Sequence, residues 1–351
     1  MGRSIWSLIV KNFDNSSRFA QGSVILDKYV VKKILTRGQA FQLLAVEDCS
    51  DRCARIIRVL RRSLVPENRV SDDVRWLLDE RNDDGRHAVF CGLISDYSHH
   101  YLIFERSGRS LQHVVRDSSL ILTKRHIREI ARQVLRAVRS LHADSILHTN
   151  ISSANIDLVN PETVTELVYT ADGTFRERKV LASSHVRLAF YGQAALLDSI
   201  PVGTDQYCAP EIVFGIGAME ESDVFSVGCV VADLIFRHSL FPAVADGPLY
   251  KHEKAILYDA LLGPFPLTAK EDIRLRCPGV FDEREEDMNI LDAGISADVR
   301  LFAESCCNLR DLATDSGDLA VLLSMLQLDY RRRPDLVFLE ENFEFFSPTS
   351  F

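Results

Sequence analysis

The spacing of apolar residues changes once along this chain, and that change constrains the fold more than any other feature. Between residues 24 and 104 the apolar residues gather in β-branched and aromatic runs typical of strands, with a helical stretch at Asp72–Leu78. From Thr123, which suits an N-cap, to Leu141, apolar residues recur every three or four positions, as on one face of a helix. Strands followed by long helical segments predict an α+β fold.

Composition limits the class of protein. The chain has 351 residues, of which 46% are hydrophobic and 26% charged, which is ample for one large or two modest cores. No apolar run reaches the roughly 18 residues that a membrane span needs, so we expect no membrane association. The apolar stretch Ile5–Val10 is too short for a signal peptide core, and residues 1–22 are predicted to be a tail.

Charge and cysteine usage suggest a location and a kind of partner. The eight cysteines include no Cys-x-x-Cys pair, which favours reduced thiols in an intracellular protein of the nucleus or cytoplasm. The net charge of −9 argues against direct nucleic-acid binding and suits a basic protein partner.

Residues 145–155, which follow the long helical segment, read Ser-Ile-Leu-His-Thr-Asn-Ile-Ser-Ser-Ala-Asn. The segment resembles the catalytic loop of protein kinases, His-x-Asp-(x)4-Asn. In that loop the Asp accepts the proton of the substrate hydroxyl, and the Asn holds a metal ion. Asn155 is in place, but Asn150 stands where the Asp is expected. An amide can orient a hydroxyl, but it cannot take its proton.

The position of the magnesium-binding Asp in the family is also occupied by a different residue. The apolar segment Val186–Gly192 resembles the kinase strand that ends in Asp-Phe-Gly, whose Asp binds magnesium. Phe190 occupies the Asp position and cannot bind a metal. The resemblance therefore leaves Asn155 as the one predicted metal ligand.

The nucleotide-binding elements of the family are reduced in the same way. Gly38 is the single survivor of three glycines expected in a hairpin that approaches phosphates. Arg58 stands where a Lys should pair with the phosphates, and Asp73 is the best match for the Glu that holds this Lys. Taken by themselves, Gly38 marks a turn between strands, and Arg58 and Asp73 are solvated surface charges.

The strand Tyr101–Phe104 and the residues after it resemble the hinge of a kinase. Phe104 takes the position at the gate of the adenine pocket, followed by Glu105 and Ser107. Because the hinge backbone holds adenine in this fold, a degenerate sequence can still bind a purine.

The structural landmarks of the kinase domain are better kept. Ala209-Pro210-Glu211 closes the activation segment in the family, and an apolar helix is predicted from Ser222 onward. The resemblance makes Arg333 the buried partner of Glu211. The arginines of the helix at 123–141 lie off its apolar stripe, and we interpret them as a solvated face.

Several features together resemble the LAMMER, or CDC-like, dual-specificity kinases. They are His148-Thr149, a hairpin insert at 164–180 with an Asp-Gly turn, and a helix at Glu253–Gly263. Kinases of Arg-Ser-rich splicing factors share the first of these. The family implies a bilobal kinase domain over 23–347, with a small β-rich N-lobe at 23–107 and a large helical C-lobe at 108–347. It also implies ATP and magnesium as cofactors and Arg-Ser-rich proteins as substrates.

The coincident changes at Asn150, Phe190, Arg58, Asp73 and the glycine hairpin favour one function. We expect a pseudokinase, a binding or scaffold module that holds a protein partner, basic or Arg-Ser-rich, with ATP and magnesium binding in doubt. The alternative is a weakly active Ser/Thr kinase of dual specificity that phosphorylates Arg-Ser-rich proteins. A third interpretation is an unrelated ligand-binding globule.

Overall fold

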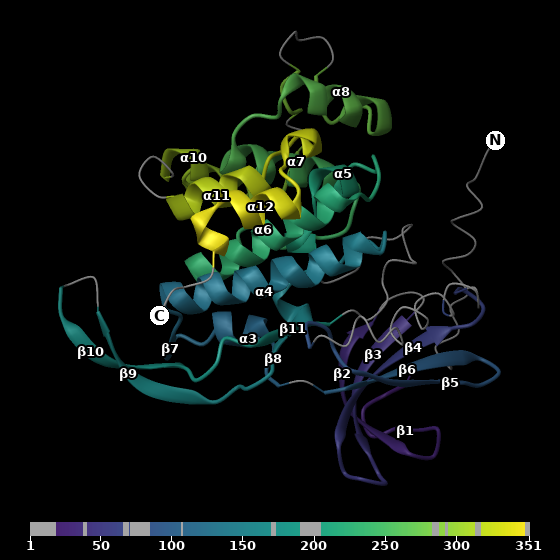
Figure 1. Ribbon diagram of the computed structural model, residues 1–351. Helices are drawn as coiled ribbons and strands as arrows, with labels where there is room; N and C mark the ends of the chain where they lie inside the picture. Colours follow the sequence, from purple (N-terminus) through teal and green to yellow (C-terminus); the bar gives the residue numbers. More distant parts are fainter. Residues whose placement is uncertain are drawn as a thin grey trace, which may run out of the picture. The chain divides into compact units, whose positions relative to one another are not determined.

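The first part of the chain is rich in strands and the later part is mainly helical, as the apolar spacing predicts (Figure 1). The computed structural model describes residues 19–37, 41–65, 70, 85–106, 108–169, 173–189, 205–282, 288–291, 294–312 and 317–347. The chain divides into a strand-rich unit, Met1–Leu77 with Val89–Arg106, and a helical unit, Leu78–Ala88 with Ser107–Phe351. No helix in these ranges is long and apolar enough to cross a membrane.

The strand-rich unit is built on a six-stranded antiparallel sheet with the order β1-β2-β3-β4-β6-β5. Its strands are β1 (Val24–Ile25), β2 (Tyr29–Arg37), β3 (Phe41–Asp48), β4 (Ala54–Arg61), β5 (Phe90–Ser95) and β6 (His99–Glu105). Five of them lie in the strand-like runs of the sequence, and β5 was not predicted, because its mostly exposed residues lack a clear alternation. The predicted helix at Asp72–Leu78 lies outside the described residues.

The two faces of this sheet differ. One face buries an aliphatic and aromatic cluster: Ile25, Tyr29, Val31, Leu44, Val46, Ile57, Val59, Tyr101 and Ile103. Phe19 packs against this cluster, with its ring 6.2 Å from that of Tyr101. Because residues directly opposite on paired strands share a face, Leu43, Arg58 and Leu102 lie together on the other face.

The helical unit contains a long amphipathic helix and a long apolar helix that pack against each other (Figure 1). Its helices are α3 (Leu111–Val115), α4 (Lys124–Ala143), α5 (Pro210–Val213), α6 (Glu220–Phe236), α7 (Tyr250–Leu262), α8 (Leu267–Arg276), α9 (Ala297–Ser305), α10 (Leu309–Leu312), α11 (Gly317–Met325) and α12 (Leu336–Asn342). Short 3₁₀ turns occur at Ser153–Asn155, Asp205–Tyr207, Tyr330–Arg332 and Glu344–Phe346.

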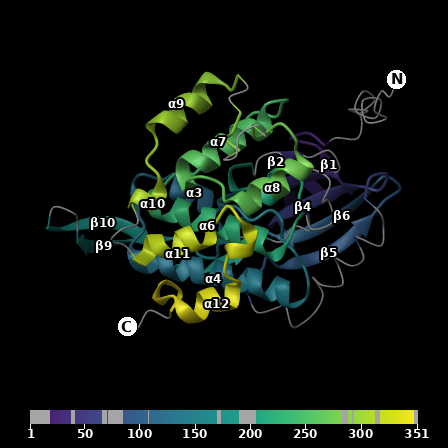
Figure 2. The same cartoon turned by 90° about the horizontal axis from the view of Figure 1, so that it is seen from above.

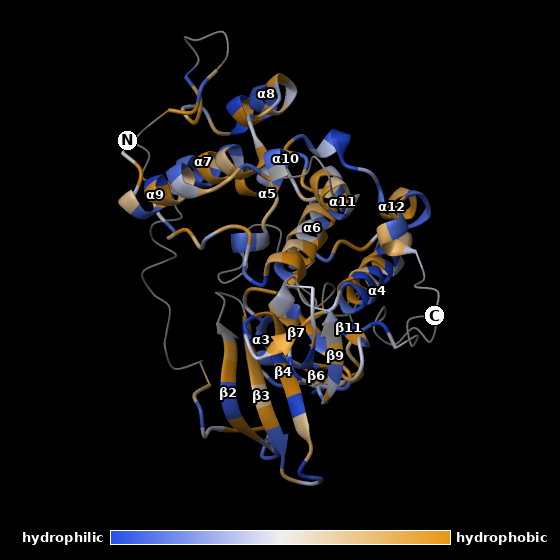
Figure 3. Cartoon of the chain, turned by 90° about the vertical axis from the view of Figure 1, so that its left-hand side faces the viewer, coloured by the Kyte–Doolittle hydropathy of each residue, from blue (hydrophilic) through white to orange (hydrophobic). Residues whose placement is uncertain are grey.

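Helix α4 begins after the predicted N-cap, Thr123, and buries its predicted apolar face. The side chain of Thr123 accepts a hydrogen bond from the amide of His126 and so caps the helix. In Figure 3 this helix carries hydrophobic and hydrophilic residues on different sides. Several of its arginines form ion pairs with acids of later helices, as Arg136 and Arg139 do with Glu340.

Helix α6 is buried almost all round, as its apolar sequence predicts. At Gly228 an added Cβ would lie 3.1 Å from the Cβ of Met325. The glycine therefore permits the close approach of α11 to α6.

Two small sheets complete the helical unit. Strands β8 (Ile156–Leu158) and β11 (Val186–Leu188) pair antiparallel, and a three-stranded sheet has the order β7-β10-β9. In the latter, β9 (Thr163–Tyr169) and β10 (Phe175–Leu181) form the predicted hairpin, while β7 (Leu120–Ile121) pairs parallel to β10. Seen from above, the hairpin extends beyond the helices (Figure 2).

The predicted ion pair between Glu211 and Arg333 is confirmed. The guanidinium binds both carboxylate oxygens, at 2.6 and 2.8 Å, and both side chains are at most 1% exposed. Arg333 also donates to the carbonyls of Glu221 and Gln327, and it lies over the ring of Phe225. Because the charges are buried, paired and hydrogen-bonded, this pair joins α5, α6 and the C-terminal segment.

We expect Arg333→Ala to lower the free energy of unfolding by about 3–5 kcal/mol, because it leaves the Glu211 carboxylate buried without its cation. Arg139→Ala is a matched control, since Arg139 makes an ion pair with its side chain 48% exposed. The control should lose no more than about 1 kcal/mol. Urea unfolding of the three proteins measures the difference, and equal midpoints for Arg333→Ala and the parent would contradict the prediction.

Candidate functional site

The loop at 144–155 is held in place by one buried carboxylate of α6. Asp223 accepts hydrogen bonds from the backbone amides of His148 and Thr149, both at 2.8 Å, and lies 3.0 Å from the Nε2 of His142. Its side chain is 1% exposed. The carboxylate thus joins the end of α4, the loop and α6 through charge-assisted hydrogen bonds.

These bonds stabilise a backbone conformation that is intrinsically unfavourable for its residue. Thr149 has a φ of 59°, in the left-handed region, which is costly for a β-branched residue. The amide of Thr149 is fixed by Asp223. Burial lowers the pKa of His148, so its ring is neutral and its Nδ1 accepts from the amide of Asn150.

The two asparagines of the predicted loop motif come together. The side-chain amide of Asn155 donates to the carbonyl oxygen of Asn150 at 2.8 Å. Asn150 itself is only 7% exposed, and its Oδ1 has no hydrogen-bond partner in the described part of the chain. The loop therefore keeps its backbone arrangement while an amide occupies the base position.

Magnesium does not fit the side chains of this loop. Magnesium prefers oxygen ligands and is usually held by one or two carboxylates besides water and phosphate. Asn155 offers a single amide oxygen, Asn150 offers another that is buried, and position 190 is a Phe. Within the described ranges, no group of three or more His, Cys, Asp or Glu residues could hold a metal ion.

A second buried carboxylate binds the next part of the loop. Asp233 of α6 accepts from the hydroxyls of Ser153 and Tyr207, both at 2.6 Å on the same oxygen. The other oxygen of Asp233 has no hydrogen-bond partner among the described residues. The same is true of the buried hydroxyl of Ser152, which precedes Ser153 in the loop. Burial raises the pKa of Asp233 to about 6.

Arg58, predicted from its sequence alone to be a solvated surface charge, is buried. It is 1% exposed, and its guanidinium carbon lies 5.4 Å from the centre of the Phe41 ring. The reason is the register of the sheet, which places Phe41 and Arg58 on one face of neighbouring strands. Arg58 thus lies on the face of the sheet opposite the aliphatic and aromatic cluster, with an aromatic ring beside it.

The structure describes only some of the other predicted site residues. Phe104 is fully buried and packs edge-to-face on Phe90 at 5.5 Å, while Glu105 is exposed and its amide donates to the carbonyl of Val89. Four positions lie outside the described residues and remain predictions: Gly38, Asp73, Ser107 and Phe190.

Sequence reasoning missed three residues of the site. Asp223 and Asp233 were not assigned a role, although acids inside a strongly apolar helix are a signal of buried, bonded carboxylates. Phe41 was missed because its contact with Arg58 depends on strand register, which no local pattern gives.

The raised pKa of Asp233 makes stability depend on pH. Its folded pKa of about 6 exceeds the ordinary value of 3.8, so its contribution to stability is complete below about pH 4 and is lost as pH rises through 6. At about pH 7 we expect Asp233→Asn to raise the free energy of unfolding by about 1–3 kcal/mol. The gain should vanish towards about pH 4.

Denaturant unfolding across this pH range measures the effect. The exposed Asp246→Asn is the control, because it removes the same charge without a buried carboxylate. A variant at position 233 that is less stable than the parent at neutral pH would contradict the assignment.

Comparison with known proteins agrees with this geometry. Residues 88–333 match the protein kinase domain. The dual-specificity protein kinase lkh1 of Schizosaccharomyces pombe is 27% identical over 263 residues, covering 72% of this chain and 36% of the relative. The serine/threonine-protein kinase AFC1 of Arabidopsis thaliana is 26% identical over 261 residues, covering 71% and 55%. Human dual specificity protein kinase CLK2 is 31% identical over 176 residues, covering 49% and 34%.

This chain thus spans about a third to a half of the length of these relatives. Among solved structures, the PF14_0431 kinase domain superposes with a TM-score of 0.73 at 22% identity, covering 94% of this chain and 98% of that one. That likeness shows the fold, with a β-rich N-lobe and a helical C-lobe. The chain belongs to the protein kinase domain family and is related to the dual-specificity kinases of the CDC-like, or LAMMER, type.

Proposed function

We propose that this protein is a pseudokinase, a kinase-fold module that binds a protein partner and transfers no phosphate. The observation that carries the proposal is the buried Asn150 in a loop whose backbone is anchored by Asp223. A group that cannot ionise occupies the position from which the family removes a proton. The fold is kept and the chemical group is missing.

The lack of carboxylate ligands for magnesium also supports the pseudokinase proposal. Phosphoryl transfer relies on metal ions that neutralise charge on the transferred group. Protein kinase domains in general bind ATP with magnesium, whereas Asn155 is the one predicted ligand that this loop retains. Loss of the base alone costs about 10²–10⁴-fold in rate, and loss of a metal ligand adds to it.

The residue at the predicted phosphate-binding position of the strand-rich unit, Arg58, also supports the pseudokinase proposal. Arg58 has the planar guanidinium of an arginine where kinases use the compact ammonium of a lysine. Its guanidinium carbon lies 5.4 Å from the centre of the Phe41 ring, within reach of a cation–π contact. We therefore propose that any nucleotide binding retained by this chain is weak.

The alternative is a weakly active Ser/Thr kinase of dual specificity. It is favoured by the names of the relatives, three of which are dual-specificity or serine/threonine kinases. In either case we propose a basic or Arg-Ser-rich protein as partner and the nucleus or cytoplasm as the location, in keeping with a net charge of −9.

We expect no phosphate transfer from ATP to an Arg-Ser peptide above background. Asn150→Asp and Phe190→Asp should each remain inactive, because each restores one of two missing groups. The double variant should gain weak activity that requires magnesium. Rates for the parent, both single variants and the double variant measure this with radiolabelled ATP.

Asn155→Ala is the control for the assay, since it removes the retained metal ligand. Turnover by the parent that disappears in Asn155→Ala would support the weak kinase and overturn the proposal. Clear activity from Asn150→Asp alone would show that Phe190 is no obstacle to metal binding.

Nucleotide binding, if it occurs, should not depend on magnesium. A ligand that binds only the folded state raises the melting temperature as its concentration rises above Kd. We therefore expect the same shift with ATP whether magnesium or a chelator is present. A larger shift with magnesium, abolished in Asn155→Ala, would show that a functional metal site remains.

A further inference from the structure

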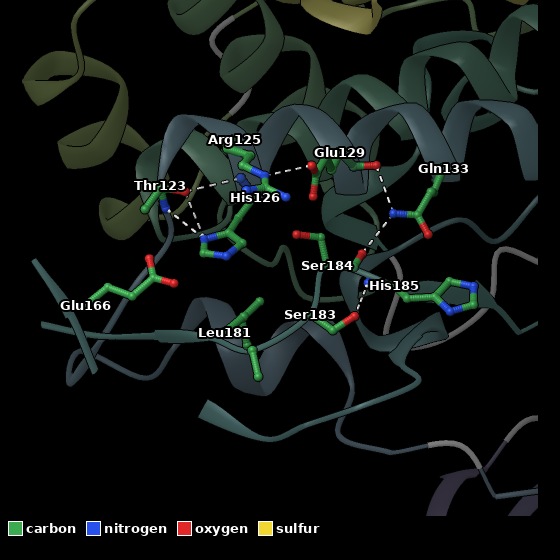
Figure 4. A pocket seen from close by; sticks show the side chains of 11 residues that line it. Thr123, Arg125, His126, Glu129, Gln133, Glu166, Leu181, Ser183, Ser184 and His185 are labelled. Atoms are coloured by element: carbon green, nitrogen blue, oxygen red, sulfur yellow. Dashed lines mark hydrogen bonds and ion pairs between the residues drawn. The ribbon is translucent and has the colours of Figure 1, made fainter. Parts of the chain in front are cut away.

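A cavity of about 390 Å³ lies in the helical unit, between the first turns of α4 and the end of the β9–β10 hairpin. We call it the hairpin pocket. It is lined by Thr123, Arg125, His126, Glu129, Gln133, Glu166, Leu181, Ala182, Ser183, Ser184 and His185 (Figure 4). Its size is within the range of ligand-binding pockets. None of its residues belongs to the catalytic loop.

The floor of the pocket is held in shape before any ligand binds. Gln133 donates to the carbonyls of Glu129 and Ser184, and its Oε1 accepts from the amide of Val186. The bonds to Ser184 and Val186 fix the segment after β10 against α4, and the bond to Glu129 holds the Gln133 side chain on the helix. At the rim, His126 and Thr123 cap the helix with their side chains. A rigid floor lowers the entropic cost of binding.

Acceptor groups dominate the lining. Glu129 and Glu166 supply carboxylates, and the one cation, Arg125, already binds Glu129 at 2.9 Å with its own side chain 59% exposed. Burial lowers the pKa of His126, so its ring carries no positive charge at neutral pH. The charges of the lining therefore sum to about −1 at neutral pH.

The hydroxyl of Ser184 also lacks a hydrogen-bond partner among the described residues. Ser184 is 8% exposed, and although its carbonyl accepts from Gln133, its hydroxyl makes no hydrogen bond within the described part of the chain. Figure 4 shows this hydroxyl pointing towards His126 and Glu129, with Glu166 reaching in from β9. As a lining group with no partner in the protein, it can exchange a hydrogen bond with a ligand in the pocket.

Glu166 makes no ion pair within 4 Å among the described residues, although, after the hydrogen bond with Glu129, the attraction of its charge contributes to the raised pKa of Arg125. Arg178 lies directly opposite it on β10, but its guanidinium donates to the carbonyl of Glu177 at 3.4 Å and does not line the pocket. The Glu166 carboxylate is therefore available to an incoming cation.

We propose that the hairpin pocket binds an arginine side chain of a protein partner. A guanidinium presents five N–H donors in a plane, which suits separate acceptors on Glu166, Glu129 and Ser184 better than the single ammonium of a lysine does. The partner's arginine competes with the exposed Arg125 for hydrogen bonds to the Glu129 carboxylate. This site is distinct from the catalytic loop, so the inference holds whether the protein is a pseudokinase or a weak kinase.

The probe is a short fluorescent peptide of alternating arginine and serine, with matched peptides in which lysine or glutamate replaces arginine. Fluorescence anisotropy with the full chain gives Kd for each. We expect the arginine peptide to bind about 3-fold more tightly than the lysine peptide, and the glutamate peptide not to bind. Equal affinity for arginine and lysine would overturn the assignment of a guanidinium.

Variants locate the binding. Glu166→Gln and Ser184→Ala should each weaken binding of the arginine peptide, the former about 5-fold. Glu177→Gln is the matched control, because it removes the same charge from the neighbouring strand on the opposite face of the hairpin. It should change Kd by less than about 2-fold.

Two further results would overturn the proposal. One is an unchanged Kd in both pocket variants, which would place the peptide elsewhere. The other is an equal loss in Glu166→Gln and Glu177→Gln, which would indicate attraction by overall charge. Thermal unfolding of every variant confirms that it is folded, and Glu166 is an exposed strand residue whose replacement leaves the fold intact.

Discussion

The catalytic loop depends on the Asp223 carboxylate. It binds the amides of His148 and Thr149 and contacts His142, so one buried charge fixes the end of α4, the turn and α6 together. The left-handed Thr149 persists because this carboxylate satisfies its amide. Breaking such a bond in a buried place costs more than the bond itself, since the charge remains without its donors.

The residues that stabilise this fold are different from those that would perform its chemistry. Asp223 and the Glu211–Arg333 pair are buried, paired and satisfied, and none of them would touch a substrate. Asn150 stands in the loop that Asp223 supports. Replacement of a carboxylate by an amide of the same shape removes the base without disturbing that support. A kinase fold can therefore outlast its activity, in keeping with the proposed pseudokinase.

Much of the fold could be predicted from periodicity, and less of the site. The helix capped by Thr123 and the hairpin at 164–180 follow from local patterns, and the structure has both. The burial of Arg58 could not be predicted, because it depends on Phe41 across a strand pair, and register is a property of the whole sheet. The strand β5 was missed for a similar reason, since its pairing with β6 decides its conformation.

Helix α6 contacts the loop at two points ten residues apart, or about 15 Å along the helix axis. At the first, Asp223 binds N–H groups through both oxygens; at the second, Asp233 binds two hydroxyls through one oxygen and leaves the other without a donor among the described residues. The backbone between His148 and Ser153 is thus fixed at both ends. The position of the side chain at 150 follows from this backbone and from the bond between Asn155 and the carbonyl of Asn150. Whether that side chain is a base or an amide is a separate matter from where it lies, and this independence is why loss of the base leaves a well-formed loop.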